Sequence, residues 1–442
     1  MLRRKAMEKI EAWKRMKKKK CLLVNGARQV GKTFLVREFG RANYSSFIEL
    51  NFLEKPSLKT IFDGELDADA VRAGIRLSDP GVKFRDGDTM IFLDEIQECP
   101  NAISALKFLA EDPRADIAAS GSALGMAYGR VSSYPVGSID YLDMHALDFE
   151  EFLWALGVEE DEIRLLRDYY LRRETVPPAI HLSMQKYLRQ YMVIGGMPEV
   201  VDTFLPEKDY PAADEVQRRI YRDYLADIAR FAAPDVKIKA ESCYRSIPLQ
   251  LSKENHKFQY SVVEKKGTAR KFESSLDWLA NANMISVVTN VGFVEYPLKA
   301  HALENNTRIY PNDIGLLMAA YDYGLKKALL EEETMDGRPG NIVLRTAKGG
   351  LYEALIADML TKAGHRELFF YRNEPGTVEM EFLLENADGV IPVEVKAGKK
   401  SSRSLANLLK KEDIPYGYKL ASQNIGVSDK MITLPLYMAI FL

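Results

Sequence analysis

The chain has 442 residues, of which 47% are hydrophobic, so it is long enough for two to four globular domains with cores of their own. Its 61 Lys and Arg residues are balanced by 63 Asp and Glu residues, and the formal charge of −2 excludes binding to nucleic acid through bulk positive charge. Three scattered cysteines and five isolated histidines exclude a disulfide framework and a zinc cluster, and the lack of a signal sequence or of an apolar run of about 20 residues predicts a cytoplasmic protein without membrane spans.

Residues 1–155 are predicted to form one α/β domain. The chain opens with a short, basic, amphipathic helix within residues 2–20. Apolar runs then predict strands at 21–25, 47–51, 89–94 and 116–119, with helices near 32–40, 66–77 and 102–111. Strands that alternate with helices are typical of a mainly parallel sheet with helices on both faces.

A phosphate-binding loop lies between the first strand and the helix that follows it. The segment that matches the P-loop pattern in full is Gly26-Ala27-Arg28-Gln29-Val30-Gly31-Lys32-Thr33. Glycine lets the backbone approach phosphate, and the start of the helix supplies N–H donors and the positive end of its dipole. We expect Lys32 to bridge the β- and γ-phosphates of ATP and the Thr33 hydroxyl to ligate Mg²⁺.

Polar side chains end two further strands. Asp94 and Glu95 follow the apolar run at 89–93, and ligands bind at the carboxyl ends of strands in open parallel sheets. We expect Asp94 to hold Mg²⁺ through water and Glu95 to polarise the attacking water. Ser120 and Ser122 are candidates for sensing the γ-phosphate, with an ordinary turn as the alternative. Arg130 is a candidate for the arginine that neutralises charge in the transition state.

The middle of the chain has two predicted regions. Residues 156–235 are predicted to form a helical lid, because helical and charged patterns dominate there. Residues 236–335 contain a helix followed by predicted strands at 285–289 and 293–298, which indicates a winged helix. Such modules bind DNA or act as spacers between proteins, and the sequence leaves both open. The acidic and then Gly/Pro-rich segment 331–340 is a predicted linker.

A small α/β domain is predicted for residues 341–442. Period-two alternation places Glu394 and Lys396 on one face of a strand. The turn at 386–389 is typical of a hairpin and would bring Glu381 close to Glu394. The predicted helix is 350–363, and the predicted strands are 367–371, 379–384 and 390–396.

Carboxylates and a lysine on a small sheet are the parts of a restriction-endonuclease-like site. Glu353, Glu381 and Glu394 would hold Mg²⁺, which supports attack of water on a phosphodiester. Lys396 would orient the water or stabilise the charge of the transition state. The alternative is an inactive domain in which the same charges form a row of salt bridges facing solvent.

The chain resembles bacterial and archaeal AAA-type ATPases that carry a C-terminal domain of unknown function related to restriction endonucleases. The segments that carry this resemblance are Asn25–Thr33, Phe92–Gln97, Ser120–Ser122, Asp148–Phe152, Gly195–Glu199 and Tyr221–Tyr224. The resemblance covers nearly the whole chain and implies an AAA-like core, a helical and winged-helix middle, and a nuclease-like end. Ser120 stands where the family usually has Thr, and Glu381 stands where many relatives have Asp. The second departure shifts a metal ligand and weakens the case for a nuclease.

The sequence as a whole predicts an enzyme that binds and hydrolyses ATP with Mg²⁺, coupled to a nuclease-like or nucleic-acid-binding C-terminal domain. The alternative is an ATP-driven molecular switch whose C-terminal domain is catalytically inactive. A nucleotide is the expected ligand, and DNA and a second copy of the chain are left open as partners.

Overall fold

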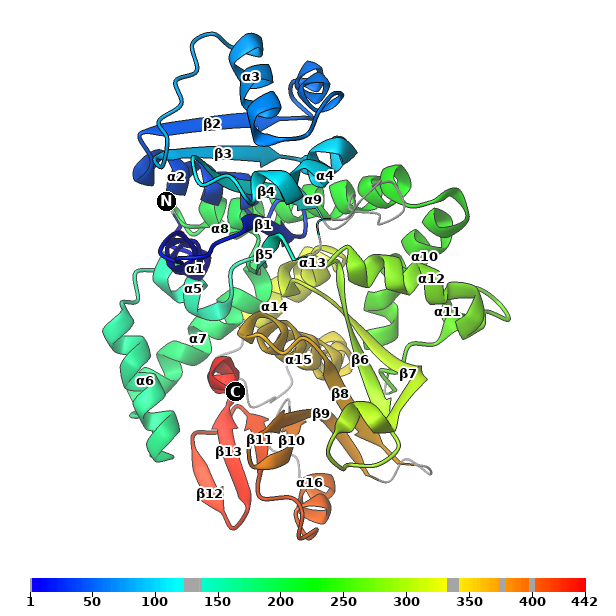
Figure 1. Cartoon of the computed structure of the whole chain (residues 1–442). Coiled ribbons are helices and arrows are strands. Elements are labelled where there is room, and N and C mark those ends of the chain that lie inside the picture. The colour runs from blue at the N-terminus through cyan, green and yellow to red at the C-terminus, as the bar shows by residue number, and fades with distance from the viewer. Residues whose placement is uncertain are drawn as a thin grey trace. The chain divides into compact units, whose positions relative to one another are not determined.

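The computed structural model describes residues 2–122, 135, 137–253, 255–331, 342–373, 378–396 and 402–442, with only the backbone at 122 and 342–347. The chain divides into two compact units (Figure 1). The first comprises Arg3–Ala146 and Asn281–Asn283, and the second comprises Leu147–Ala280 and Met284–Leu442. None of the described helices combines the length and apolar character that crossing a membrane requires.

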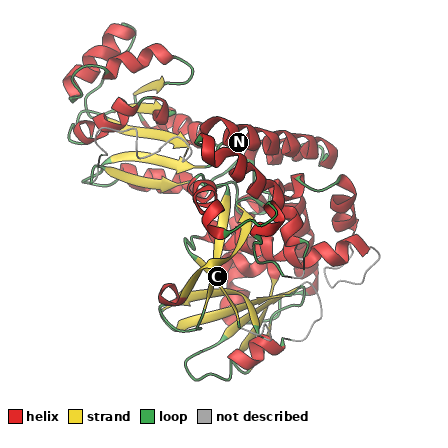
Figure 2. Cartoon of the chain, turned by 90° about the vertical axis from the view of Figure 1, so that its right-hand side faces the viewer, coloured by secondary structure: helices red, strands yellow, loops and turns green. Residues whose placement is uncertain are grey.

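The first unit contains a five-stranded sheet in the order β2-β3-β4-β1-β5, and every neighbouring pair is parallel. All residues of β3 are buried, as expected for a strand covered on both faces. Figure 2 shows helices on both sides of these strands, which confirms the predicted architecture. The strands are β1 (Cys21–Gly26), β2 (Ser46–Asn51), β3 (Thr89–Asp94), β4 (Asp116–Ser122) and β5 (Ile139–Asp143); the helices are α1 (Lys5–Lys14), α2 (Lys32–Asn43), α3 (Ala68–Ser78) and α4 (Pro100–Leu109), with short 3₁₀ helices η1 (Pro56–Phe62) and η2 (Ile96–Glu98).

The second unit contains an eight-stranded mixed sheet in the order β12-β13-β11-β10-β9-β8-β6-β7. Three of its neighbouring pairs are parallel, namely β10–β11, β11–β13 and β6–β8, and the others are antiparallel. The strands are β6 (Ile285–Val291), β7 (Ala302–Pro311), β8 (Leu368–Arg372), β9 (Glu379–Asn386), β10 (Gly389–Val395), β11 (Gly417–Ala421), β12 (Gly426–Ser428) and β13 (Met431–Pro435).

Strands from the middle and C-terminal regions share this sheet. β6 pairs with β8 in parallel, with Val288 opposite Leu368. The predicted second strand of the winged helix, at 293–298, is wrong, because residues 293–297 form a loop, a 3₁₀ helix begins at Leu298, and β7 begins only at Ala302. Pro297 cannot donate a backbone hydrogen bond to a ladder, which disfavours a strand there. The division into four domains stays a prediction.

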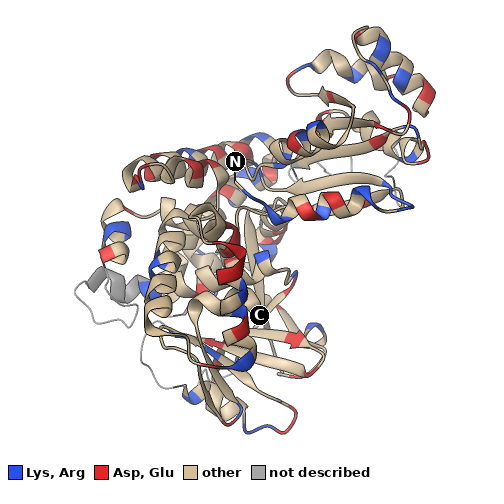
Figure 3. Cartoon of the chain, turned by 90° about the vertical axis from the view of Figure 1, so that its left-hand side faces the viewer, with Lys and Arg blue, Asp and Glu red and all other residues tan. Residues whose placement is uncertain are grey.

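Several helices of the second unit pack against its sheet. α5 begins with a capping box, because the Asp148 side chain accepts from the Glu151 amide at 2.8 Å and the Glu151 carboxylate accepts from the Asp148 amide at 3.1 Å. In the view of Figure 3, basic and acidic residues are interspersed along the same elements, in line with the small net charge. The helices are α5 (Phe149–Ala155), α6 (Glu160–Arg172), α7 (Pro178–Ile194), α8 (Pro198–Phe204), α9 (Tyr210–Phe231), α10 (Pro234–Leu251), α11 (Tyr260–Val263), α12 (Ala269–Asn281), α13 (Ile314–Ala319), α14 (Tyr323–Glu331), α15 (Ile342–Ala363) and α16 (Arg403–Leu408), with 3₁₀ helices η3 (Leu298–His301) and η4 (Leu436–Phe441).

A fully buried ionic network lies in the core of the second unit. Lys362 Nζ is 3.1 Å from Asp313 Oδ2 and 2.8 Å from Asp358 Oδ1. Lys362 also donates to the hydroxyl of Tyr191 at 2.9 Å and to the carbonyl oxygen of Leu147 at 3.1 Å. Burial raises the pKa of Asp358 to about 7, against the lowering effect of Lys362. Two buried carboxylates thus share one lysine.

The Gly195–Glu199 motif has a structural explanation in this network. The Gly196 amide donates to Asp313 Oδ2 at 2.7 Å, and the Gly196 carbonyl accepts from the Leu147 amide at 2.7 Å. A Cβ atom on Gly196 would lie 2.0 Å from the carbonyl oxygen of Leu147. Only glycine allows this close approach between the end of α7 and the segment that precedes α5.

Candidate nucleotide site and C-terminal carboxylate cluster

The phosphate loop has the strand–loop–helix context that its sequence predicts. β1 ends at Gly26 and α2 begins at Lys32. Gly31 has a φ of 96°, a left-handed conformation that favours glycine. A Cβ atom on Gly26 would lie 2.1 Å from the carbonyl oxygen of Met144. Gly31 is therefore favoured by the loop's own backbone, and Gly26 by the close approach of the segment that follows β5.

The ammonium group of Lys32 is held against the loop. Nζ donates to the carbonyl oxygens of Gly26 at 3.0 Å and Ala27 at 2.7 Å, and the residue is only 8% exposed. Burial lowers the pKa of Lys32 to about 8, although Glu95 and Asp94 act to raise it. The site thus presents a desolvated cation beside two carboxylates.

The Asp94 carboxylate accepts hydrogen bonds from three side chains of the site. Its Oδ1 accepts from the Thr33 hydroxyl at 2.9 Å, its Oδ2 accepts from the Asn51 amide at 2.9 Å, and it also accepts from the Ser120 hydroxyl. Burial raises the pKa of Asp94, while the hydrogen bonds from Ser120 and Thr33 act to lower it. A hydroxyl oxygen beside a carboxylate is a donor set that suits Mg²⁺.

Asn51, Asp94 and Ser120 come from the neighbouring strands β2, β3 and β4 of the sheet. Ser120 on β4 therefore lies beside Asp94 on β3, as their hydrogen bond shows. The sequence reasoning did not identify Asn51. The sequence signal for Asn51 was its position as a polar residue at the carboxyl end of the strand predicted at 47–51. In the structure this strand is β2, and Asn51 lies opposite Asp94.

Glu95 follows β3 directly in an unusual conformation. Its φ of 55° is left-handed, which costs a residue other than glycine on the order of 1 kcal/mol. Its carboxylate accepts a hydrogen bond from the Gln97 side chain. The backbone and Gln97 therefore orient this carboxylate beside Asp94. Arg130 and the side chain of Ser122 lie outside the described residues.

A second cluster of charges lies on the C-terminal strands. The β9–β10 hairpin has Gly389 opposite Asn386, as its turn predicts. Lys396 Nζ is 3.0 Å from Glu394 Oε1 and 3.6 Å from Glu381 Oε1, so the two carboxylates share one lysine. Burial raises the pKa of Glu381 to about 7, against the lowering effect of Lys396. Glu394 is 1% exposed, and its Oε2 has no hydrogen-bond partner among the described residues.

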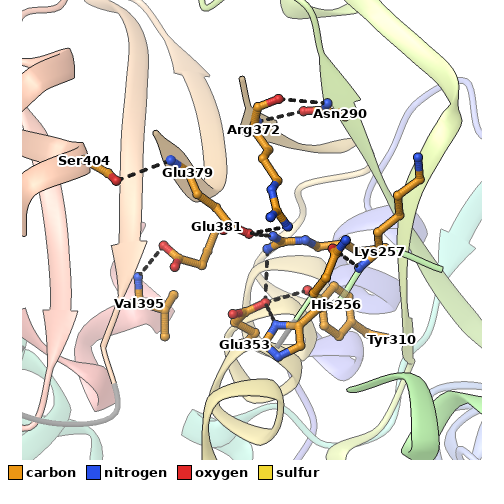
Figure 4. A network of polar contacts seen from close by, with 12 residues as sticks. His256, Lys257, Asn290, Tyr310, Glu353, Arg372, Glu379, Glu381, Val395 and Ser404 are labelled. Carbon is orange, nitrogen blue, oxygen red and sulfur yellow. Dashed lines mark hydrogen bonds and ion pairs between the residues drawn. The ribbon is translucent and has the colours of Figure 1, made fainter. Parts of the chain in front are cut away.

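Glu353 is committed to other partners (Figure 4). Its Oε2 lies 2.8 Å from His256 Nδ1 and accepts from Arg308 and the Tyr310 hydroxyl, each at 3.1 Å. Arg308 also pairs with Glu379. These partners come from β7 and from the loop after α10, so sequence reasoning on residues 341–442 could not find them.

The three predicted metal-binding carboxylates have different ionic partners. Among the described residues, no set of three or more His, Cys, Asp or Glu side chains is arranged to hold a metal ion. Arg308 pairs with Glu353, and Lys396 pairs with Glu381 and Glu394, while Glu353 still acts to raise the pKa of Glu381.

Three family models match parts of the chain. Residues 18–153 match an AAA domain, residues 185–328 match a domain of unknown function (DUF8612), and residues 348–437 match a second domain of unknown function (DUF4143). The match to the AAA domain falls almost entirely within the first unit. Among curated proteins, none matches the chain.

Three solved structures show a distant likeness to the chain. The Walker-type ATPase PABY2304 of Pyrococcus abyssi has 14% identity and a TM-score of 0.44, covering 72% of this chain and 96% of that one. The Orc1 protein of Aeropyrum pernix, solved in complex with DNA, has 12% identity and a TM-score of 0.28, covering 74% and 91%. Cdc6p of Pyrobaculum aerophilum has 11% identity and a TM-score of 0.23, covering 71% and 88%. These values are too low to assign a ligand or partner to this chain.

Proposed function

We propose that the first unit binds ATP with Mg²⁺ at residues 26–33 and hydrolyses it. The observation that carries this proposal is the convergence of Thr33, Asn51 and Ser120 on the Asp94 carboxylate, next to the buried ammonium of Lys32. A cation site and a phosphate-pairing group side by side are what phosphoryl transfer requires.

Each side chain has a distinct part in this proposal. The backbone N–H groups that open α2 would donate to the phosphates, and Lys32 would pair with the β- and γ-phosphate oxygens. Thr33 Oγ1 and the Asp94 carboxylate would hold Mg²⁺, which when bound neutralises charge on the phosphates. Glu95 would accept a hydrogen bond from the attacking water, and Ser120 would hold the Asp94 carboxylate in place.

The direct test is ATP binding and phosphate release by the full chain. We expect binding in calorimetry, and hydrolysis that requires Mg²⁺ and stops when EDTA removes the metal. A folded chain that neither binds ATP nor releases phosphate in the presence of Mg²⁺ would contradict the proposal.

ATP affinity should depend on pH through Lys32. The pKa of about 8 means that the ammonium is charged below pH 8 and loses its proton above it. Phosphate favours the charged form, so the dissociation constant for ATP should rise by about tenfold per pH unit above this pKa. Calorimetry in buffers of different ionisation enthalpy should show proton uptake near pH 8.

Lys32→Arg is the matched control for this pH dependence, because a guanidinium stays charged throughout the range. Its ATP affinity, whatever its absolute value, should be nearly constant from about pH 7 to about pH 9.5. A parent protein with constant affinity over the same range would rule out a titrating Lys32.

A second candidate function, for the C-terminal domain, is Mg²⁺-dependent cleavage of DNA coupled to ATP hydrolysis. The observation that favours it is the buried Glu394 Oε2 without a partner among the described residues, beside Glu381 and Lys396. The unpartnered oxygen of Glu394, close to the Glu381 carboxylate, fits a divalent cation, which when bound activates water. Lys396 would then stabilise charge on the phosphodiester. The rival is a nucleotide-driven switch in which this cluster is only structural.

Two variants of the full chain should separate binding of the cation from cleavage. Glu394→Gln should lose both Mn²⁺ binding and nicking of plasmid DNA, because it removes a ligand. Lys396→Met should keep Mn²⁺ binding, because it removes only a competing cation, and should lose cleavage by about 100-fold or more. Binding is measured by calorimetry without nucleotide.

Glu367→Gln is the control for these variants, since Glu367 is an exposed acid that pairs with Lys299 at the surface. It should change neither property. A parent that binds no Mn²⁺ and nicks no plasmid or single-stranded DNA, with or without ATP, would leave the switch as the remaining function for this domain.

A further inference from the structure

Arg4, which lies just before α1 and outside the P-loop motif, holds the phosphate loop. Its Nη1 donates to the carbonyl oxygen of Val30 at 2.9 Å, and its Nη2 donates to the carbonyl oxygen of His145 at 2.6 Å. Val30 is inside the loop, and His145 follows β5. One guanidinium thus joins the loop to a second backbone segment of the first unit.

The contact with Val30 controls the next backbone donor of the loop. The Val30 carbonyl and the Gly31 amide belong to one planar peptide unit, and this bond is trans. In a trans peptide the C=O and N–H groups point in opposite directions. The hydrogen bond from Arg4 holds the Val30 carbonyl toward the Arg4 side chain. The Gly31 N–H must therefore point in the opposite direction, away from Arg4.

The other end of the loop is supported independently. The Met144 amide donates to the Asn25 carbonyl at 2.8 Å, and the Met144 carbonyl leaves room only for glycine at position 26. Arg4 binds the residue after Met144. The segment 144–145 therefore supports the start of the loop directly and its end through Arg4.

We infer that Arg4 is a positioning residue for ATP binding, which fixes the direction of the Gly31 N–H donor in the phosphate loop. The inference rests on the proposed ATP function of that loop. Arginine suits this task because its rigid fork of N–H groups reaches two carbonyl oxygens at once, whereas the single ammonium of lysine has no such fork.

The neighbouring Arg3 provides a matched control. It is also basic and precedes α1, but its Nη2 pairs with Glu8 at 3.3 Å and its side chain is 49% exposed. Exposed pairs of this kind contribute little. Arg3→Ala and Arg4→Ala therefore remove the same charge from adjacent positions, and only the second removes the contact with Val30.

The test compares the full-length parent, Arg3→Ala, Arg4→Ala and Arg4→Lys with ATP and Mg²⁺. Arg4→Ala should raise the dissociation constant for ATP by about tenfold, as expected for a misaligned donor to a charged group. The KM should rise in parallel while kcat changes by less than about twofold, because the donor acts equally before and during the reaction. Arg3→Ala should stay within about twofold of the parent.

Arg4→Lys keeps the positive charge but removes the forked guanidinium, so it distinguishes an effect of geometry from an effect of charge. It also serves as the test variant if Arg4→Ala does not fold. It should bind ATP more weakly than the parent at both low and high salt. Full affinity in Arg4→Lys, or equal affinity in Arg3→Ala and Arg4→Ala, would overturn the inference while the ATP function stands. A melting temperature that falls in Arg4→Ala with unchanged ATP affinity would reduce Arg4 to a structural role. A parent that binds no ATP would overturn the proposed function and this inference together.

Discussion

Glu95→Gln is expected to bind ATP as tightly as the parent and to hydrolyse it about 100-fold more slowly or worse. The amide has nearly the shape of the carboxylate but cannot accept the proton of the attacking water. Glu95 follows β3 beside Asp94, and Gln97 orients its carboxylate. The variant should therefore form a long-lived complex with ATP. Calorimetry measures the affinity, and phosphate release in a single turnover measures the chemical step.

Lys32→Ala should show the opposite pattern, because it removes the phosphate-pairing charge and should lose most of the affinity for ATP.

Glu98→Gln is the control for Glu95, since Glu98 lies three residues further on and pairs with Lys59 at 3.4 Å. Unchanged turnover in Glu95→Gln would show that another group polarises the water.

Lys362→Met is expected to lower the free energy of unfolding by about 3–5 kcal/mol. Methionine fills a similar volume, but it leaves Asp313 and Asp358 buried without their cation. It also removes the donor to the Leu147 carbonyl. Urea unfolding followed by circular dichroism measures the loss. Lys327→Met is the control, because Lys327 is exposed and pairs with Glu331 at 3.7 Å, and it should change stability by less than about 1 kcal/mol.

The pH dependence of this loss provides a second measurement. Burial already raises the pKa of Asp358 to about 7, far above the value for the unfolded chain. A group whose pKa is raised by folding contributes stability at low pH and loses it as the pH rises through the folded value. The deficit of Lys362→Met should therefore be largest above pH 7 and shrink toward about pH 5, where Asp358 is protonated. A small deficit that does not vary with pH would mean that solvent reaches the network.

The amino-acid sequence by itself determined the features that depend on contiguous residues. The P-loop at 26–33 is a local backbone design, in which glycines permit the turn and the helix start supplies donors, so its pattern was sufficient to locate it. The apolar run of β3 is likewise a local signal, and the strand lies where the sequence places it. Period-two alternation and the turn at 386–389 also predicted the β9–β10 hairpin.

Tertiary structure alone decided which distant residues meet. Asn51 reaches Asp94 because β2 pairs with β3, and Arg4 reaches Val30 across the fold of the first unit. Glu353 is neutralised by Arg308, a residue of β7. The order of strands in a sheet and the pairing of buried charges depend on how many helices and strands pack together. The free energy of each ion pair depends on how deeply it is buried, and a short segment of sequence does not determine that burial. The position of the phosphate loop could therefore be predicted from the sequence. The residues that hydrogen-bond to the loop, and those that pair with the C-terminal carboxylates, could be identified only in the folded chain.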